Sequence, residues 1–439
     1  MKLNHLAVAS ASLAVLSAVP AAAQVPGTPR ALGMGGAYIG AARGAESLFQ
    51  NPANLGLPNA PTWSAAFPTL SLGLGARGLE LEDLGDLAQY DDLTQEERDA
   101  LLADIPAGGT GLDLDLRAPV AALQYGRFAG SVSYAMLGSH TINRSIVDLV
   151  VNGFDRNQAY TINNTEGFRA AFWDIAAAYG NRVGPVALGA TVHAYFPRAL
   201  VRSGLVDIDT VYGTVQGVPG SVPTDVRVTY AGVRSESGNG LGLDIGAALQ
   251  PMPGLTISAS LENVVNTMAF GESLGVRTVV LDQNDYMDGD PEQILDEYEQ
   301  SETEYAEASA LPGTRALAAA LNGDRKAGLP MTLRAGAAYQ LGTGTTLSTA
   351  FQKELDDDSP FGALWGQQLA LGVQQRLPII TLRAGLATDM EDGALLSGGL
   401  SLGPIHLGVA RVSMGGADDE RSGWIATFGL GGRSDTVQR

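Results

Sequence analysis

The stretch LGLDIGAALQ at residues 241–250 alternates, one residue at a time, between apolar positions and small or polar positions. After the short segment PMPG at 251–254, the stretch LTISASLE at 255–262 repeats the same alternation. A period of two is typical of a β-strand, whereas a helix would distribute these residues around its axis. The two stretches therefore predict a β-hairpin with one apolar face and one polar face.

About fourteen segments of this kind follow one another, and lengths of about 9–13 residues suit tilted membrane strands. Short turns alternate with long connections, as in outer-membrane barrels that have short periplasmic turns and long external loops. The short turns are expected at 126–127, 181–184, 251–254, 342–343, 377–378 and 403, and the long connections at 75–115, 140–168, 197–239 and 266–328. The strands are expected to start near Trp63, Leu116, Phe128, Arg169, Gly184, Gly240, Gly254, Leu329, Thr345, Gln367, Ile379, Leu395, Pro404 and Ser422.

Two of the long connections have helical character. The segment 84–105 contains Thr94, a good N-cap residue, followed by the acidic first turn Gln95-Glu96-Glu97. The segment 290–320 is acidic at first and then rich in alanine. We expect helical insertions in both, outside the barrel or over its mouth.

The composition agrees with a membrane barrel. Hydrophobic residues make up 45% of the chain and charged residues 17%, with 56 glycines, whereas about a quarter of a soluble domain is charged. A barrel shows apolar side chains to lipid and fills its lumen with small and polar ones. The net charge of −20 argues against nucleic acid as a partner. The absence of cysteine excludes disulfides, thiolate chemistry and a lipoprotein anchor.

The N-terminus has the parts of a secretory signal peptide: Lys2, the apolar run Leu6–Val19 and the small-residue site Ala21-Ala22-Ala23. We expect cleavage before Gln24. We expect no transmembrane helix after it, because no later apolar run reaches about 18 residues. The predicted location is the outer membrane, with its lipid and the barrel-assembly machinery as partners. A soluble sandwich or propeller is the alternative, but no blade repeat is present.

Two motifs precede the first strand. Gly33-Met34-Gly35-Gly36-Ala37 is followed by Asn51-Pro52-Ala53-Asn54-Leu55. This pair resembles the opening of the superfamily that holds the long-chain fatty-acid transporters, the shuttle proteins of type IX secretion and the conjugal-transfer barrels. The segments 101–114, 128–132, 148–160 and 238–244 resemble a branch of that superfamily with no assigned function.

The resemblance implies a fourteen-stranded barrel with the N-terminal segment folded inside as a plug. Glycine allows close packing against an inner wall, and Asn51-Pro52 favours a turn. A flexible lead-in is the alternative reading. For a plug, we expect the Asn51 side chain to bond backbone of the wall or the plug, because a buried amide left unpaired is costly. The expected organisation is a signal peptide at 1–23, a plug at 24–60, a barrel at 61–431 and a tail at 432–439.

The lumen offers polar candidates but no clear reaction centre. His193, Asp244, Glu262, Arg334 and Arg383 are expected to face inward. Internal salt bridges are expected between the two arginines and Asp244, Glu262 and Asp389, whereas His193 is expected to fill the polar lumen. A lumenal hydrolase needs a nucleophile next to a histidine, which the sequence does not place, so we expect no enzyme and no cofactor. The acidic stretch 282–290 resembles an oxygen-rich cation site, but its spacing does not match a 12-residue calcium loop. An exposed acidic loop is expected, binding of Ca²⁺ or Mg²⁺ is the alternative, and no metal ligands are assigned.

These observations favour passive transport of hydrophobic small molecules. The alternative is a non-transporting scaffold or secretion shuttle that binds an exported protein. Superfamily resemblance favours transport, whereas the long acidic loops favour a protein partner and the polar, glycine-rich inner faces weigh against an apolar conduit.

Overall fold

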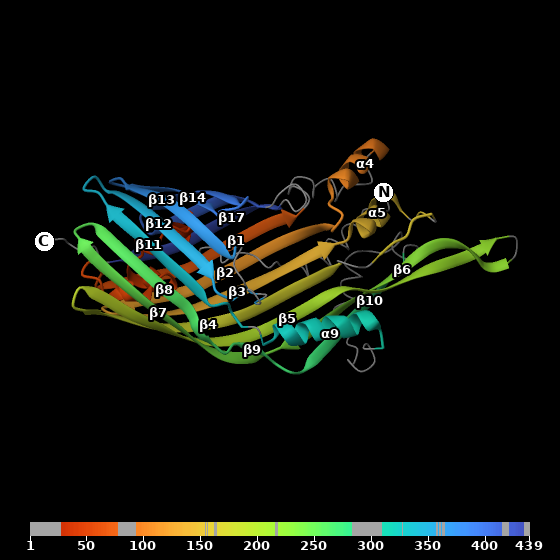
Figure 1. Ribbon diagram of the computed structural model, residues 1–439, viewed down its shortest axis with the longest axis horizontal. Helices are drawn as coiled ribbons and strands as arrows, with labels where there is room; N and C mark the ends of the chain where they lie inside the picture. Colours follow the sequence, from red (N-terminus) through yellow and green to blue (C-terminus); the bar gives the residue numbers. More distant parts are fainter. Residues whose placement is uncertain are drawn as a thin grey trace.

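The computed structural model describes residues 28–77, 94–153, 155, 157–161, 165–215, 218–282, 310–326, 328–356, 359, 361, 365–414 and 421–433. It is a closed antiparallel β-barrel of fourteen strands (Figure 1), as predicted. The expected signal peptide, its cleavage site and the end of the tail lie outside the described residues. The acidic stretch also lies outside them, apart from its first residue.

Seventeen strand segments form the fourteen wall strands. Segments β6 and β7 make one wall strand that is interrupted at Ser237, and β8, β9 and β10 together make the next. Strand β1 pairs with both β2 and β17 and so closes the barrel. The bounds are β1 (Trp63–Arg77), β2 (Thr110–Tyr125), β3 (Phe128–Ile142), β4 (Glu166–Val183), β5 (Val186–Val215), β6 (Val218–Glu236), β7 (Gly238–Met252), β8 (Leu255–Asn266), β9 (Ala269–Phe270), β10 (Leu274–Asp282), β11 (Thr332–Gln340), β12 (Thr345–Glu354), β13 (Gln367–Arg376), β14 (Ile380–Thr388), β15 (Ala394–Leu402), β16 (Ile405–Met414) and β17 (Arg421–Arg433).

All six predicted short turns are present, and they join strands at one end of the barrel (Figure 1). Tight hairpin turns commonly place a residue in the left-handed region, which glycine adopts at little steric cost. Five of the turns contain a glycine with positive φ: Gly126, Gly184, Gly254, Gly344 and Gly403. We call this end the short-turn end.

Alternation along the strands also agrees with the sequence. In β7, Leu241 and Ile245 are exposed, whereas Asp244 and Ala248 are buried. In β17, Trp424 and Phe428 are exposed between buried neighbours. Side chains that would meet lipid are thus apolar, as in other transmembrane barrels.

The strands beside the longest connection are longer than expected. Strand β5 has 30 residues and β6 has 19, so much of the predicted loop 197–239 is a β-hairpin that extends beyond the barrel (Figure 1). Strand β10 continues this extension by pairing with β6, within the predicted connection 266–328. The prediction of loops there was wrong because it assumed that strands end at the membrane boundary.

Helices lie in both predicted segments, 84–105 and 290–320, and a third helix, which was not predicted, lies in the connection 140–168. Helix α4 (Gln95–Asp104) begins with the capping box formed by Thr94 and Glu97. Helix α5 (Arg144–Asn152) packs against it, and α9 (Pro312–Asp324) packs on β5 and β6. No described helix is both long enough and apolar enough to cross a membrane.

Candidate functional site

The N-terminal segment lies inside the barrel and fills the lumen toward the short-turn end. It contains α2 (Pro29–Leu32) and two 3₁₀ helices, η1 (Gly44–Phe49) and η2 (Pro52–Gly56). Helix α2 contacts β15, β16 and β17, η1 contacts β1, β2 and β3, and η2 contacts β4, β5, β7 and β8. The plug is therefore confirmed, and it touches both sides of the β1–β17 seam.

Glycines on the plug and on the wall allow this close fit. A β-carbon on Gly33 would lie 2.9 Å from Cα of Gly399, and one on Gly35 would lie 2.9 Å from the backbone nitrogen of Leu386. On the wall side, a β-carbon on Gly372 would meet the Met34 side chain at 2.8 Å. Larger residues here would separate the plug from the wall.

Asn51 fastens the second motif to the wall. Its Nδ2 donates to the carbonyl oxygens of Ala247 in β7 and Ala259 in β8, both at 3.0 Å. Its Oδ1 accepts from the backbone nitrogen of Ala53 at 2.9 Å and so caps η2, in which Pro52 takes the first position. The side chain thus has the backbone bonds expected of a buried plug amide.

A polar network connects the first motif to the last strands. Arg30 Nη1 donates to Glu46 Oε2 at 2.8 Å, and Tyr38 donates to the same oxygen at 2.8 Å. Burial alone would raise the pKa of Glu46, but the Arg30 charge and these hydrogen bonds lower it below its ordinary value. Glu46 is therefore a carboxylate at neutral pH and holds the plug together internally.

The network continues to the wall through His406 in β16. Arg30 Nη2 lies 2.8 Å from His406 Nε2, so this nitrogen accepts and the proton is on Nδ1, which faces Ser401 Oγ at 2.8 Å. Arg383 donates to Ser401 at 2.6 Å and to Gln374 at 2.9 Å. The inward direction predicted for Arg383 fits this arrangement, but Asp389 lies apart and accepts from the backbone of its own turn.

A second polar group lies on β4, β5, β7 and β8. His193 Nδ1 lies 3.0 Å from Asp174 Oδ1, and its Nε2 lies 3.0 Å from Asp244 Oδ2. Because both ring nitrogens face carboxylates, both must donate, which requires an imidazolium. Sequence reasoning selected His193 and Asp244 but missed Asp174. Asp174 could have been found as a charged residue at an inward position of a strand.

This group also stabilises an irregularity in the wall. Three residues of β8, 262–264, lie opposite the single residue Asp244 of β7. Asn263 in this bulge has a φ of 55°, its backbone nitrogen donates to Asp244 Oδ1 at 2.7 Å, and its Oδ1 accepts from Tyr195 at 3.2 Å. Beside the bulge, Glu262 forms the predicted type of internal salt bridge with Arg334 at 3.0 Å. Bulges commonly redirect side chains next to functional sites.

Neither His193 nor His406 has the contacts of a hydrolase base. Ser401 contacts Nδ1 of His406, but the other nitrogen of that ring faces the Arg30 cation instead of an orienting carboxylate. His193 lies between two carboxylates, with no serine among its described hydrogen-bond partners. A nucleophile activated by an oriented base is thus missing at both histidines. No metal-binding group of histidine and acidic residues occurs among the described residues.

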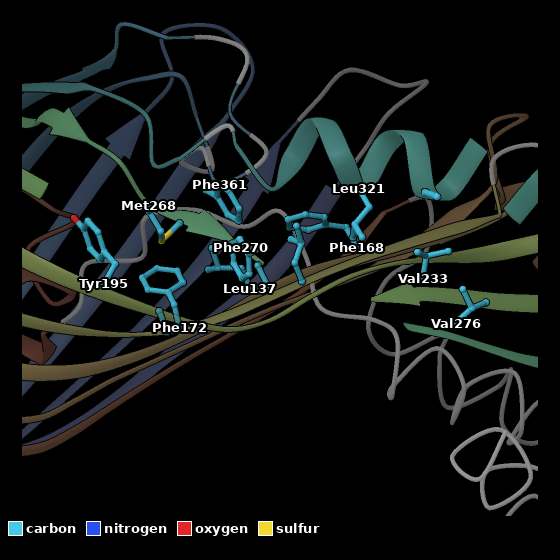
Figure 2. Close-up of a cluster of buried hydrophobic side chains, with 14 residues drawn as sticks. Leu137, Phe168, Phe172, Tyr195, Val233, Met268, Phe270, Val276, Leu321 and Phe361 are labelled. Atoms are coloured by element: carbon cyan, nitrogen blue, oxygen red, sulfur yellow. The ribbon is translucent and has the colours of Figure 1, made fainter. Parts of the chain in front are cut away.

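Beyond the polar group, toward the end opposite the short turns, apolar side chains gather inside the molecule (Figure 2). Phe361, from the β12–β13 connection, packs at 5.8 Å from Phe168 and 6.1 Å from Phe270, measured between ring centroids. We call this the apolar cluster. Its buried members are Ala135, Leu137, Phe168, Ala170, Phe172, Tyr195, Leu200, Val233, Met268, Phe270, Val276, Ala318, Leu321 and Phe361.

The fold and the plug define the chain as a plugged barrel of the outer-membrane type. It is similar to the toluene transporter TbuX of Ralstonia pickettii, with 15% identity, a TM-score of 0.51, and 93% of this chain and 99% of TbuX covered. It is also similar to a deltaS2S3 mutant of the monoaromatic hydrocarbon channel TodX, with 13% identity, the same TM-score and the same coverage of both chains. No family model and no curated protein matches the sequence.

These likenesses show the fold. The chain shares with TbuX and TodX the architecture of a single barrel over nearly the whole length of each chain.

Proposed function

We propose that this protein lies in the outer membrane and allows passive movement of hydrophobic small molecules, without chemical change of the cargo. The observation that carries the proposal is the apolar cluster. Its side chains come from wall strands, from α9 and from Phe361, and they gather inside the molecule. The transport roles in the names of TbuX and TodX support the same proposal.

Uptake of radiolabelled toluene by Gram-negative cells tests the proposal. Cells that carry the barrel should take up toluene faster than cells without it, and an uncoupler should not change the rate. Phe361→Gln places an amide among buried aromatic rings and should slow uptake several-fold, because burying an amide without a partner is costly. Phe128→Gln is the matched control, since Phe128 is 65% exposed near the short turns. Equal uptake with and without the barrel would refute transport.

Fractionation tests the location. The barrel should stay in outer-membrane fractions after carbonate extraction and should migrate differently on gels when samples are not heated. Recovery in the soluble periplasm would contradict the proposal.

A scaffold that binds an exported protein is the second candidate. The extension of β5, β6 and β10 beyond the barrel favours it, since this hairpin offers surface that a conduit does not need (Figure 1). Replacing residues 210–226 with a short turn would distinguish the two functions. If the protein is a transporter, the variant should still take up toluene. If the protein is a scaffold, the variant should no longer crosslink to an exported protein.

A further inference from the structure

One arginine stands on the outer face of the wall without an acidic partner. Arg411 lies on β16, and its side chain is exposed on the same face as Leu407 and Val409. It has no ion pair and no hydrogen bond within the part of the chain that the structure describes. The chain has 47 acidic residues and only 27 basic ones, so an exposed cation without an acid is unusual in it. Because a cation on the lipid face costs least near the interface, Arg411 marks the level of the headgroups.

The neighbouring strand adds an aromatic ring at the same level. Arg411 and Trp424 of β17 are directly opposite each other, and the guanidinium carbon lies 6.0 Å from the centre of the Trp424 ring. The Trp424 side chain is 50% exposed. Tryptophan is enriched where a barrel wall meets the headgroups, so this pair defines that boundary on β16 and β17. Both residues lie toward the end opposite the short turns, which is the external end in barrels of this type.

The side chains above and below this boundary differ as the two ends of a lipid do. Toward the external end, Ser413 and Ser422 are opposite each other on the same face as Arg411, about 7 Å further along the strands. Toward the short turns the face is apolar, with side chains that are 43–48% exposed: Leu407, Val409 and Phe428. This face therefore presents, in order, two hydroxyls, a cation beside an indole, and an apolar band.

We propose that this face of β16 and β17 binds a phosphorylated lipid of the outer leaflet. The planar guanidinium of Arg411 donates two parallel hydrogen bonds to the phosphate, a geometry that suits arginine better than lysine. Ser413 and Ser422 donate to the same headgroup, and the acyl chains lie along the apolar band. An anionic lipid supplies in one molecule the negative charge that Arg411 lacks and the apolar contact below it. The inference rests on the proposed outer-membrane location and deepens it by naming a lipid partner and its contact site.

Lipid A with and without its phosphates forms a matched pair of probes. Native mass spectrometry of the full-length barrel in detergent, with a chelator present to remove bridging metal ions, gives an apparent Kd for each lipid. The wild type should bind the phosphorylated lipid more tightly than the dephosphorylated one. Arg411→Gln should raise the Kd of the phosphorylated lipid roughly 5- to 30-fold and leave that of the dephosphorylated lipid within about twofold, because only the contact between guanidinium and phosphate is lost.

Arg127→Gln is the matched control, since Arg127 is an exposed arginine in a short turn at the other end of the barrel and should leave both Kd values unchanged. A heat-dependent gel shift identifies folded barrels. If Arg411→Gln does not fold, Arg411→Lys serves, because it keeps the charge but loses the paired hydrogen bonds and should weaken binding of the phosphorylated lipid about 2- to 5-fold.

Three results would overturn the proposal: a wild type that does not distinguish the two lipids, a folded Arg411 variant that binds the phosphorylated lipid like the wild type, or an equal loss of binding in Arg127→Gln. Recovery of the barrel outside the outer-membrane fraction, with phosphate-dependent binding intact in detergent, would instead refute the location alone.

Discussion

Replacing Asn51 with leucine is expected to loosen the plug without unfolding the barrel. Asn51 is completely buried, and its side chain makes three hydrogen bonds to backbone at 2.9–3.0 Å, two of them to adjacent wall strands. Leucine has a similar size but can form none of them. The wall strands keep the backbone hydrogen bonds between them, so the substitution weakens the docking of the plug and not the barrel itself.

The magnitude follows from the bonds lost. Each buried hydrogen bond contributes about 0.5–1.5 kcal/mol net, and a lost N-cap costs about 1 kcal/mol. We therefore expect the free energy of plug docking to fall by about 2–4 kcal/mol. Since 1.4 kcal/mol is a factor of ten, the population of the undocked plug should rise about 30- to 700-fold.

A single thiol measures that population, because the natural chain has no cysteine. Ser47 lies on η1, is completely buried, and its hydroxyl has no hydrogen-bond partner within the described structure, so Ser47→Cys is a mild change. A water-soluble maleimide reaches this thiol only when the plug opens, so the labelling rate follows the open population. Asn51→Leu should raise that rate by the factor above.

The matched control is Asn239→Leu, because Asn239 is an exposed asparagine on β7 and should leave the labelling rate unchanged. If Asn51→Leu labels within about twofold of its parent while the gel shift shows a folded barrel, these bonds contribute little and the reasoning from hydrogen-bond losses fails.

Three further predictions concern the plug and the wall. Deleting residues 33–55 should raise single-channel conductance in planar bilayers, and unchanged conductance in a folded deletion would argue against an occluding plug. Because the folded-state pKa of Glu46 is lowered, its stabilisation of the plug is complete above about pH 4.5 and is lost only as pH falls through that lower pKa. Conductance should thus be constant from pH 8 to 5 and rise in stronger acid, whereas Glu46→Gln should lack the acid step. In the wall, Leu371→Arg places a charge on the lipid face and should destabilise the barrel by about 2–4 kcal/mol near the bilayer midplane. Ser348→Ala removes a buried unpaired hydroxyl and should change the free energy of unfolding little. Urea titration of folding into vesicles measures both changes, and equal costs would mean that the strand faces are misassigned.

Alternation was sufficient to predict the barrel wall. Lipid on one side and a filled lumen on the other require different side chains, so the faces of β7 and β8 can be read from residues 241–262. The extension was missed because it has no lipid to impose that pattern. Strand β6 contains Pro219 and Pro223, but it pairs with β10 only over Arg227–Ser235, so these prolines lie where β5 is the paired neighbour. Proline is tolerated at such an edge.

The candidate site was predicted in part. The inward faces of His193 and Asp244 follow from alternation, but their contact with Asp174 depends on the register between β4, β5 and β7, which a single strand does not encode. The structure brings Arg30 and Glu46 of the plug together with His406, which lies 376 residues after Arg30 in the sequence. No local pattern carries that information, because it depends on how the plug sits inside the closed wall.

The plug contacts have a consequence for biogenesis. Helix α2 rests on β15, β16 and β17, which leave the ribosome more than 350 residues after α2 itself. Its docking surface does not exist until the C-terminal strands have been delivered and β17 has met β1. Contacts of such long sequence separation form slowly. The plug segment therefore stays undocked until the last strands have paired, and its docking follows closure of the barrel. A chain truncated before β15 would lack the surface on which α2 docks.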